Sequence, residues 1–149
     1  MNTEISAEFV DNVVRTAAFL DGIFDKFYKQ YKVTRVQFLA LFYIIEEEPE
    51  GITLSHLGEK MGVSRANITT LADRMESAAL IKRMPDPSDR RTIKVVALPK
   101  GNRLLDEILP RRQEFIDSIL CELTEEELIQ SNKMLVKIYT SLQERLKDQ

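Results

Sequence analysis

Cysteine and histidine are almost absent from this chain of 149 residues. Cys121 is the single cysteine and His56 the single histidine. One cysteine cannot form an internal disulfide, and the chain cannot supply a cysteine-rich metal site. We therefore expect no structural metal and no cofactor.

Long apolar runs are also missing. No stretch approaches the roughly 18 consecutive apolar residues that span a bilayer, and the start at Met1–Glu4 lacks the basic and apolar segments of a signal peptide. With 44% hydrophobic and 30% charged residues, and only five glycines and five prolines, the composition is that of a globular domain with long helices. We expect a single cytoplasmic domain that makes no membrane contact.

The chain offers few residues that could form an enzyme active site. A nucleophile–base pair of Cys121 with His56 is the one arithmetically available hydrolase site, but no neighbouring residue resembles a third, orienting group. We keep this hydrolase as an alternative and expect that the protein is not an enzyme.

The charge is distributed unevenly. The formal net charge is −3, yet the segment from Gly62 to Arg112 holds eleven basic and six acidic residues, a net of +5, which leaves −8 for the rest of the chain. A local basic field attracts phosphate whatever the total charge is. This pattern indicates a basic working surface joined to an acidic scaffold.

Apolar residues at helical spacing predict six helices. Thr34 with Gln37, and Thr124 with Glu127, form capping-box patterns, and Thr53 and Ser64 are further N-cap candidates. The apolar stripe of the first helix is too wide for packing on one side only. The helices are expected at about 6–31, from Thr34 to the Glu46–Pro49 stretch, 53–62, 64–79, 99–120 and 124–147.

Between the fourth and fifth helices the period changes to the alternation of β-strands. Residues Ile81–Met84 and Thr92–Leu98 are rich in β-branched side chains, and Pro85–Asp89 between them has the composition of a turn. The expected fold is therefore mainly α with a small β-hairpin.

The segment from Thr53 to Leu71 has the pattern of a helix-turn-helix. Gly62 lets the backbone leave the first helix at low steric cost, and Val63 can fill the angle between the two helices. The polar face of the second helix carries small and hydrogen-bonding side chains, as reading a major groove requires. An ordinary helical hairpin with a solvated face is the alternative. The outward residues are Arg65, Ala66, Asn67, Thr69, Thr70, Asp73 and Arg74.

The hairpin tip adds a second cationic feature. Arg90 and Arg91 follow a proline-rich loop from which long cations can enter a minor groove. Asp89 can orient one guanidinium through a bidentate pair. A surface charge cluster that only stabilises the turn is the alternative.

Together these features resemble the MarR family of bacterial regulators. The resemblance covers about residues 6–146, and its most specific part is Asp86–Arg91, with Asp89 two positions before Arg91. It implies a winged helix-turn-helix with a DNA-binding lobe at about 34–98 and a dimerisation lobe at about 5–31 plus 99–147. It also implies a homodimer on double-stranded DNA, with Arg91 in the minor groove and Asp89 as its partner. The expected DNA-binding residues are Ser64, Arg65, Ala66, Asn67, Thr69, Thr70, Arg74, Arg83, Asp89, Arg90, Arg91 and Lys94.

Two prolines depart from the family pattern. Pro99 stands where a threonine is common, although proline suits a first helical turn. Pro110 lies inside the fifth helix and should kink or interrupt it. The dimer also has an alternative, because the apolar residues of the terminal helices could form a monomer core.

The resemblance further implies a repressor that responds to a small amphipathic or phenolic ligand. Aromatic residues that could line its pocket are Phe24, Tyr28, Tyr31, Phe38 and Phe42, with ordinary core packing as the alternative. A winged-helix module that associates with proteins instead of DNA is the remaining functional alternative.

Overall fold

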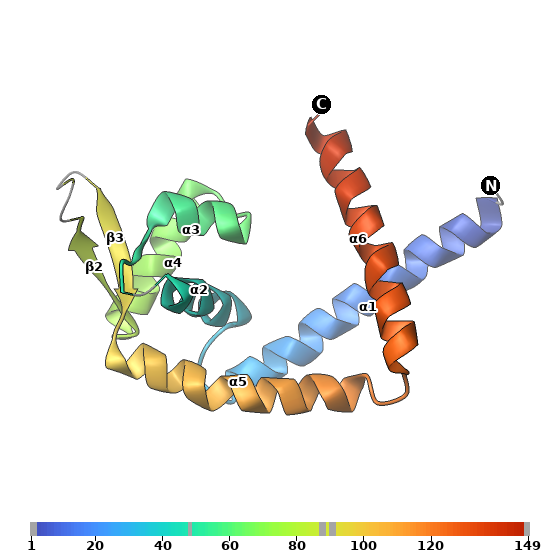
Figure 1. Cartoon of the computed structure of the whole chain (residues 1–149), viewed down its shortest axis with the longest axis horizontal. Coiled ribbons are helices and arrows are strands. Elements are labelled where there is room, and N and C mark those ends of the chain that lie inside the picture. The colour runs from blue at the N-terminus through green and yellow to red at the C-terminus, as the bar shows by residue number, and fades with distance from the viewer. Residues whose placement is uncertain (1–2, 48, 87–88, 90–91, 148–149) are drawn as a thin grey trace. The chain divides into compact units, whose positions relative to one another are not determined.

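The computed structural model describes residues 3–47, 49–86, 89 and 92–147. The chain divides into two compact units, Met1–Ile108 and Leu109–Gln149. The first unit contains the helix-turn-helix and the β-hairpin, and the second contains the end of α5 (Pro99–Ile119), a short turn and α6 (Glu125–Lys147) (Figure 1).

Four helices open the first unit, and each of the last three begins at an N-cap that the sequence predicts. They are α1 (Thr3–Lys29), α2 (Arg35–Glu46), α3 (Leu54–Met61) and α4 (Arg65–Ser77). Thr34 caps α2 in a full capping box with Gln37, because each side chain bonds the other residue's backbone N–H. Thr53 and Ser64 cap α3 and α4 in the same way with one bond each.

The helix-turn-helix bend depends on Gly62. Its φ of 64° places it in the left-handed region, where glycine carries no Cβ penalty, and its N–H bonds the carbonyls of Gly58 and Glu59. Val63 follows with a bond from its N–H to Gly58. These contacts end α3 within one residue and allow α4 to start at a new angle.

A three-stranded antiparallel sheet with the order β1-β3-β2 completes the winged fold. β2 (Ile81–Pro85) and β3 (Ile93–Ala97) form the hairpin predicted from the sequence, with Arg83 opposite Val95. β1 (Ile52–Thr53) pairs with β3 and was not predicted, because two residues are too few to show an alternating pattern. This short strand places the start of α3 beside β3.

The core of the first unit lies between its helices and the sheet. Leu41, Leu57, Ile68, Ile81 and Val95 are among the fully buried side chains. Where α5 (Pro99–Ile119) begins, Gly101 allows close packing: a Cβ at this position would lie 2.4 Å from the Leu80 carbonyl oxygen and 2.9 Å from Leu41.

The second unit holds the end of α5 and α6 (Glu125–Lys147). Thr124 and Glu127 form the second predicted capping box, with bonds of 2.8 and 3.3 Å to each other's backbone N–H. α5 continues through Pro110, so of the two expected effects of this proline the interruption is absent, and a kink stays a prediction. No described residue of α6 is buried within this chain.

The mainly α fold with a β-hairpin is confirmed. No helix in the described part of the chain is both long and apolar enough to cross a membrane. The division into a DNA-binding lobe and a dimerisation lobe stays a prediction.

Candidate nucleic-acid interface

The exposed face of α4 is polar along its whole length, as the sequence predicts. Ile68, Ala72 and Met75 turn into the core with at most 1% of their surface exposed. The seven residues predicted to face outward are all exposed, namely Arg65, Ala66, Asn67, Thr69, Thr70, Asp73 and Arg74.

Hydrogen-bond donors on this face are concentrated toward the two ends of α4. Arg65 in the first turn and Arg74 in the last turn form no ion pair with any described residue, so both guanidinium groups are available to a ligand. Asn67 offers an exposed amide near the first turn. The Ser64 hydroxyl already takes part in one hydrogen bond, because its Oγ accepts a 3.4 Å bond from the Asn67 backbone N–H.

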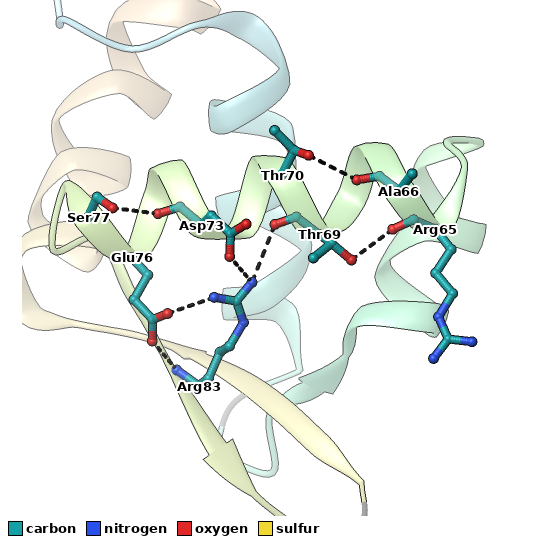
Figure 2. Close-up of polar contacts among 8 residues, drawn as sticks. All are labelled: Arg65, Ala66, Thr69, Thr70, Asp73, Glu76, Ser77 and Arg83. Atoms are coloured by element: carbon teal, nitrogen blue, oxygen red, sulfur yellow. Dashed lines mark hydrogen bonds and ion pairs between the residues drawn. The ribbon is translucent and has the colours of Figure 1, made fainter.

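The middle of the helix differs, because its hydroxyl groups bond the helix backbone. Thr69 Oγ1 donates to the Arg65 carbonyl at 2.8 Å, and Thr70 Oγ1 donates to the Ala66 carbonyl at 3.1 Å. Figure 2 shows both hydroxyls directed along the helix toward these carbonyls. Such bonds from residue i to residue i−4 are common for threonine in helices.

Arg83 on β2 connects the hairpin to α4. Its guanidinium pairs with Asp73 and with Glu76, both at 2.7 Å, and donates to the Thr69 carbonyl at 3.3 Å. Its backbone N–H also donates to Glu76 at 2.9 Å. Figure 2 shows the Arg83 side chain extended alongside α4 toward these three partners. The structure thus places Arg83 as a brace between strand and helix.

The electrostatics of this brace favour its charged form. Hydrogen bonds from the Arg83 backbone and guanidinium lower the pKa of Glu76. Burial opposes the charge of Arg83, but hydrogen bonds and attraction from Asp73 and Glu76 outweigh it and raise the pKa of Arg83. The Arg83 side chain is 24% exposed. Its predicted contact with DNA stays a prediction, and that contact would compete with these pairs.

The base of the hairpin loop is held by a small set of bonds. The Asp86 N–H donates to the Thr92 carbonyl at 2.8 Å, and Thr92 donates from its N–H and its hydroxyl to Asp89 at 2.9 and 3.0 Å. Lys94, another predicted DNA-binding residue, pairs with Asp86 at 3.0 Å. Arg90 and Arg91 lie outside the described residues, and so does the predicted pairing of Asp89 with Arg91.

A polar groove of about 320 Å³ lies between the start of α3, α4 and β3. Sequence reasoning identified Arg65 and Thr69 here but missed the other polar residues of the groove. They come from two separate segments that the pairing of β1 with β3 brings together, and β1 is too short to be recognised. The missed polar residues are Thr53, Ser55 and Thr92.

Among the five aromatic residues predicted to line a ligand pocket, Tyr28 contacts two others, Phe24 and Phe38. Tyr28 stacks on Phe38 with ring centroids 4.8 Å apart, and both are buried. Phe24 lies 6.1 Å from Tyr28, while Phe42 contacts Tyr43. Of the five, Tyr31 lines a cavity of about 410 Å³ together with Lys100 and Arg103 of α5.

The residues of the alternative hydrolase site are both exposed. His56 lies on α3 in the first unit, and Cys121 lies between α5 and α6 in the second. The described residues contain no group of three or more His, Cys, Asp or Glu side chains that could hold a metal ion.

Comparison with known proteins agrees with this architecture. The MarR family model matches residues 33–93. The chain is 34% identical to the uncharacterized HTH-type transcriptional regulator YsmB of Bacillus subtilis (strain 168), over 73% of each chain. A MarR family protein from Bacillus stearothermophilus has a similar structure, with a TM-score of 0.77, 28% identity and coverage of 96% of this chain and 99% of that one.

A further structural neighbour is the S. aureus MepR–DNA complex, with a TM-score of 0.79, 21% identity and coverage of 88% of this chain and 96% of that one. At this identity the likeness shows a shared fold. The family model, the similarity to YsmB and the winged fold together establish that the chain belongs to the MarR family and is a transcriptional regulator, not an enzyme.

Proposed function

We propose that this regulator is a homodimer that binds a pseudo-palindromic operator in double-stranded DNA, with α4 in the major groove and the wing arginine in the minor groove. The observation that carries the proposal is the exposed face of α4, where Asn67 and two arginines without an ion pair to any described residue lie beside small side chains. A helix of this shape and donor content fits the major groove. The MepR–DNA complex shares this fold.

The brace at Arg83 supports the proposed contact of the wing with the minor groove. Three bonds from one guanidinium fix β2 against α4, so the wing and the helix are presented as one surface. A wing held in this way can direct Arg90 and Arg91 toward the neighbouring minor groove, whose negative potential attracts arginine. The +5 charge of this part of the chain favours the same approach.

The homodimer is supported by apolar side chains that the single chain leaves exposed. Phe9, Val14 and Phe19 on α1 are between 42% and 73% exposed, and Leu135 and Leu142 on α6 are about half exposed. Exposed apolar patches of this extent are typical of interaction sites. A twofold dimer would bury these helices and present two copies of α4 to two half-sites.

Selection from random duplex DNA with the full-length protein tests the proposal. We expect an enriched palindromic motif whose half-site centres lie about one helical turn, roughly 10–10.5 base pairs, apart. A protein-association module would enrich no motif and show no salt-dependent DNA binding. Either result would overturn the proposal.

Arg91→Ala tests the wing. Loss of an arginine inserted into a groove should weaken operator binding by about 1–3 kcal/mol at fixed salt. Lys133→Ala, which removes one positive charge from an exposed position on α6, serves as the control and should leave the affinity within twofold. Equal affinities of wild type and Arg91→Ala would refute the wing contact.

We further propose that the protein is a repressor and that a small amphipathic or phenolic ligand weakens its operator binding. The cavity beside Tyr31 supports a ligand, since it joins an aromatic ring to the cations of Lys100 and Arg103. Titration of simple phenols and aromatic carboxylates against the operator complex tests the response, and an operator–reporter fusion tests the sign. Unchanged affinity at every concentration, or lower reporter output without the protein, would contradict these two proposals.

A further inference from the structure

Three methyl-bearing side chains lie together on the first two turns of the exposed face of α4. Ala66, Thr69 and Thr70 are neighbours at i, i+3 and i+4, and all three are exposed. Arg65 and Asn67 lie on either side of Ala66 in the first turn, and Arg74 lies in the last turn beyond the two threonines. The face therefore combines a methyl cluster with donors in its first turn and in its last turn.

The two hydroxyls within this cluster do not act as outward donors. Each gives its single hydrogen to a backbone carbonyl four residues earlier, Thr69 to Arg65 and Thr70 to Ala66. A threonine hydroxyl has one hydrogen and two lone pairs, so only acceptor capacity remains toward a ligand. Figure 2 shows the hydroxyls bent back to the helix, with the rest of each side chain outward.

Acceptors by themselves do not distinguish bases in the major groove. Every base pair carries one amino donor there, on adenine N6 or cytosine N4. Among the four standard bases only thymine adds a methyl group, which apolar contacts from alanine and threonine recognise. A surface of methyl groups without free donors matches that feature and offers nothing to guanine O6 and N7.

From this chemistry we infer that Ala66, Thr69 and Thr70 determine sequence specificity by contacting thymine 5-methyl groups at the centre of each half-site. The inference rests on the proposed function, because it requires α4 to lie in the major groove. Arg65, Asn67 and Arg74 then supply the hydrogen bonds on either side. The operator has A·T pairs under the middle of α4, and their thymine methyl groups carry the discrimination.

Uracil substitution in the selected operator tests this directly. Each thymine is replaced in turn by uracil in both half-sites, which removes one methyl group and preserves base pairing and every hydrogen-bonding group. Burial of a methyl group contributes about 0.8 kcal/mol, or about fourfold in affinity. We expect a loss of roughly fifteenfold for the two half-sites together at one or two thymine positions.

Two matched double variants connect the effect to α4. Thr69→Val with Thr70→Val keeps a γ-methyl group at both positions and removes both hydroxyls, whereas Thr69→Ser with Thr70→Ser keeps the hydroxyls and removes the methyls. The valine variant should lose as much affinity on uracil substitution as the wild type. The serine variant should lose the sensitivity at the thymines that the two threonines contact and keep it at any thymine that Ala66 contacts. Both variants should fold, because these positions are exposed.

The remaining outcomes overturn the inference. A wild type indifferent to uracil at every position, a serine variant as sensitive as the wild type, or a valine variant that has lost the sensitivity would each exclude methyl recognition by these threonines. A selection that enriches no duplex would overturn the proposed function itself. A well-defined site that tolerates uracil would overturn the inference alone.

Discussion

The winged-helix part and the terminal helices use apolar residues in opposite ways. In the winged-helix part, Leu41, Leu57, Ile68 and Ile81 are no more than 1% exposed, so this part buries its apolar side chains within the chain. In the second, residues 3–24 of α1 and the described residues of α6 contain no buried side chain. We refer to these two segments as the apolar arms.

This difference distinguishes the winged-helix part, which one chain stabilises by itself, from the apolar arms, whose side chains only a partner would bury. Burial of apolar surface is the main favourable contribution to folding, at about 25 cal/mol per Å². The winged-helix part gains it within the chain, while the apolar arms leave most of it unused. The comparison therefore predicts that substitutions in the arms act through assembly, and that those in the winged-helix part act through local stability.

The largest effect is expected from charges placed on α6. Leu135 and Leu142 lie on one side of the helix, seven residues apart, and are 49% and 56% exposed. Leu135→Glu with Leu142→Glu should dissociate the proposed dimer, because its interface would have to bury unpaired carboxylates. Operator affinity should then fall by at least a hundredfold, measured by sedimentation together with DNA titration.

The matched control adds two carboxylates to the opposite side of the same helix. Gln130 and Thr140 are exposed there, and replacing both with glutamate changes the net charge equally. That variant should remain a dimer. If both double variants stayed dimeric, or if both dissociated, the apolar stripe would not be the interface.

A smaller effect, on the free energy of unfolding, is expected from replacing one glycine in each region with alanine. In Gly101→Ala the new Cβ would meet the Leu80 carbonyl oxygen at 2.4 Å, so backbone must shift. Overpacking of this kind costs about 1–3 kcal/mol. In Gly22→Ala on α1 the new Cβ has no neighbour within 4 Å, and alanine favours a helix by about 1 kcal/mol.

Urea unfolding of both alanine variants measures this contrast. The free energy of unfolding should decrease for Gly101→Ala and stay equal or increase for Gly22→Ala. A destabilised Gly22→Ala would show that α1 is closely packed at this position in the assembled protein. An unaffected Gly101→Ala would show that α5 can move away from Leu80 without cost.

Local features of the fold could be predicted from sequence, and contacts between distant segments could not. The capping boxes at Thr34 and Thr124 are visible because both partners lie within four residues of each other. The Arg83 brace joins residues 7, 10 and 14 positions apart across a turn. Sequence reasoning grouped Arg83 with the DNA-binding cations, because composition does not reveal which carboxylate a cation meets.

Contacts between distant segments also escaped prediction at the edges of the candidate nucleic-acid interface. The outward face of α4 follows from helical periodicity, and all seven residues predicted there are exposed. Ser77 at the end of the helix is also exposed and was not predicted. The polar groove beside it depends on the pairing of Ile52 with Val95, which no short-range pattern encodes. Pro110 shows the reverse case, since a local signal that allowed an interruption did not end the helix, which runs for 21 residues.

The smallest effect concerns the pH dependence of the brace. Arg83 lowers the pKa of Glu76 below its ordinary value of 4.5, so the folded state favours the ionised carboxylate. This contribution to stability is present above pH 4.5 and is lost as the pH falls through the lowered folded-state pKa. Glu76→Gln should therefore be less stable than wild type at pH 7, by at most about 1 kcal/mol for so exposed a pair.

Urea unfolding of wild type and Glu76→Gln between pH 7 and pH 3 measures this difference, which should shrink as the solution becomes acidic. Glu59→Gln removes a carboxylate that is exposed on α3 and has no ion pair with any described residue, so it controls for the loss of charge. A difference between wild type and Glu76→Gln that stayed constant down to pH 3 would mean that Glu76 acts through packing. A difference that disappears together with weaker operator binding would mean that the brace between β2 and α4 presents wing and helix to DNA as one surface.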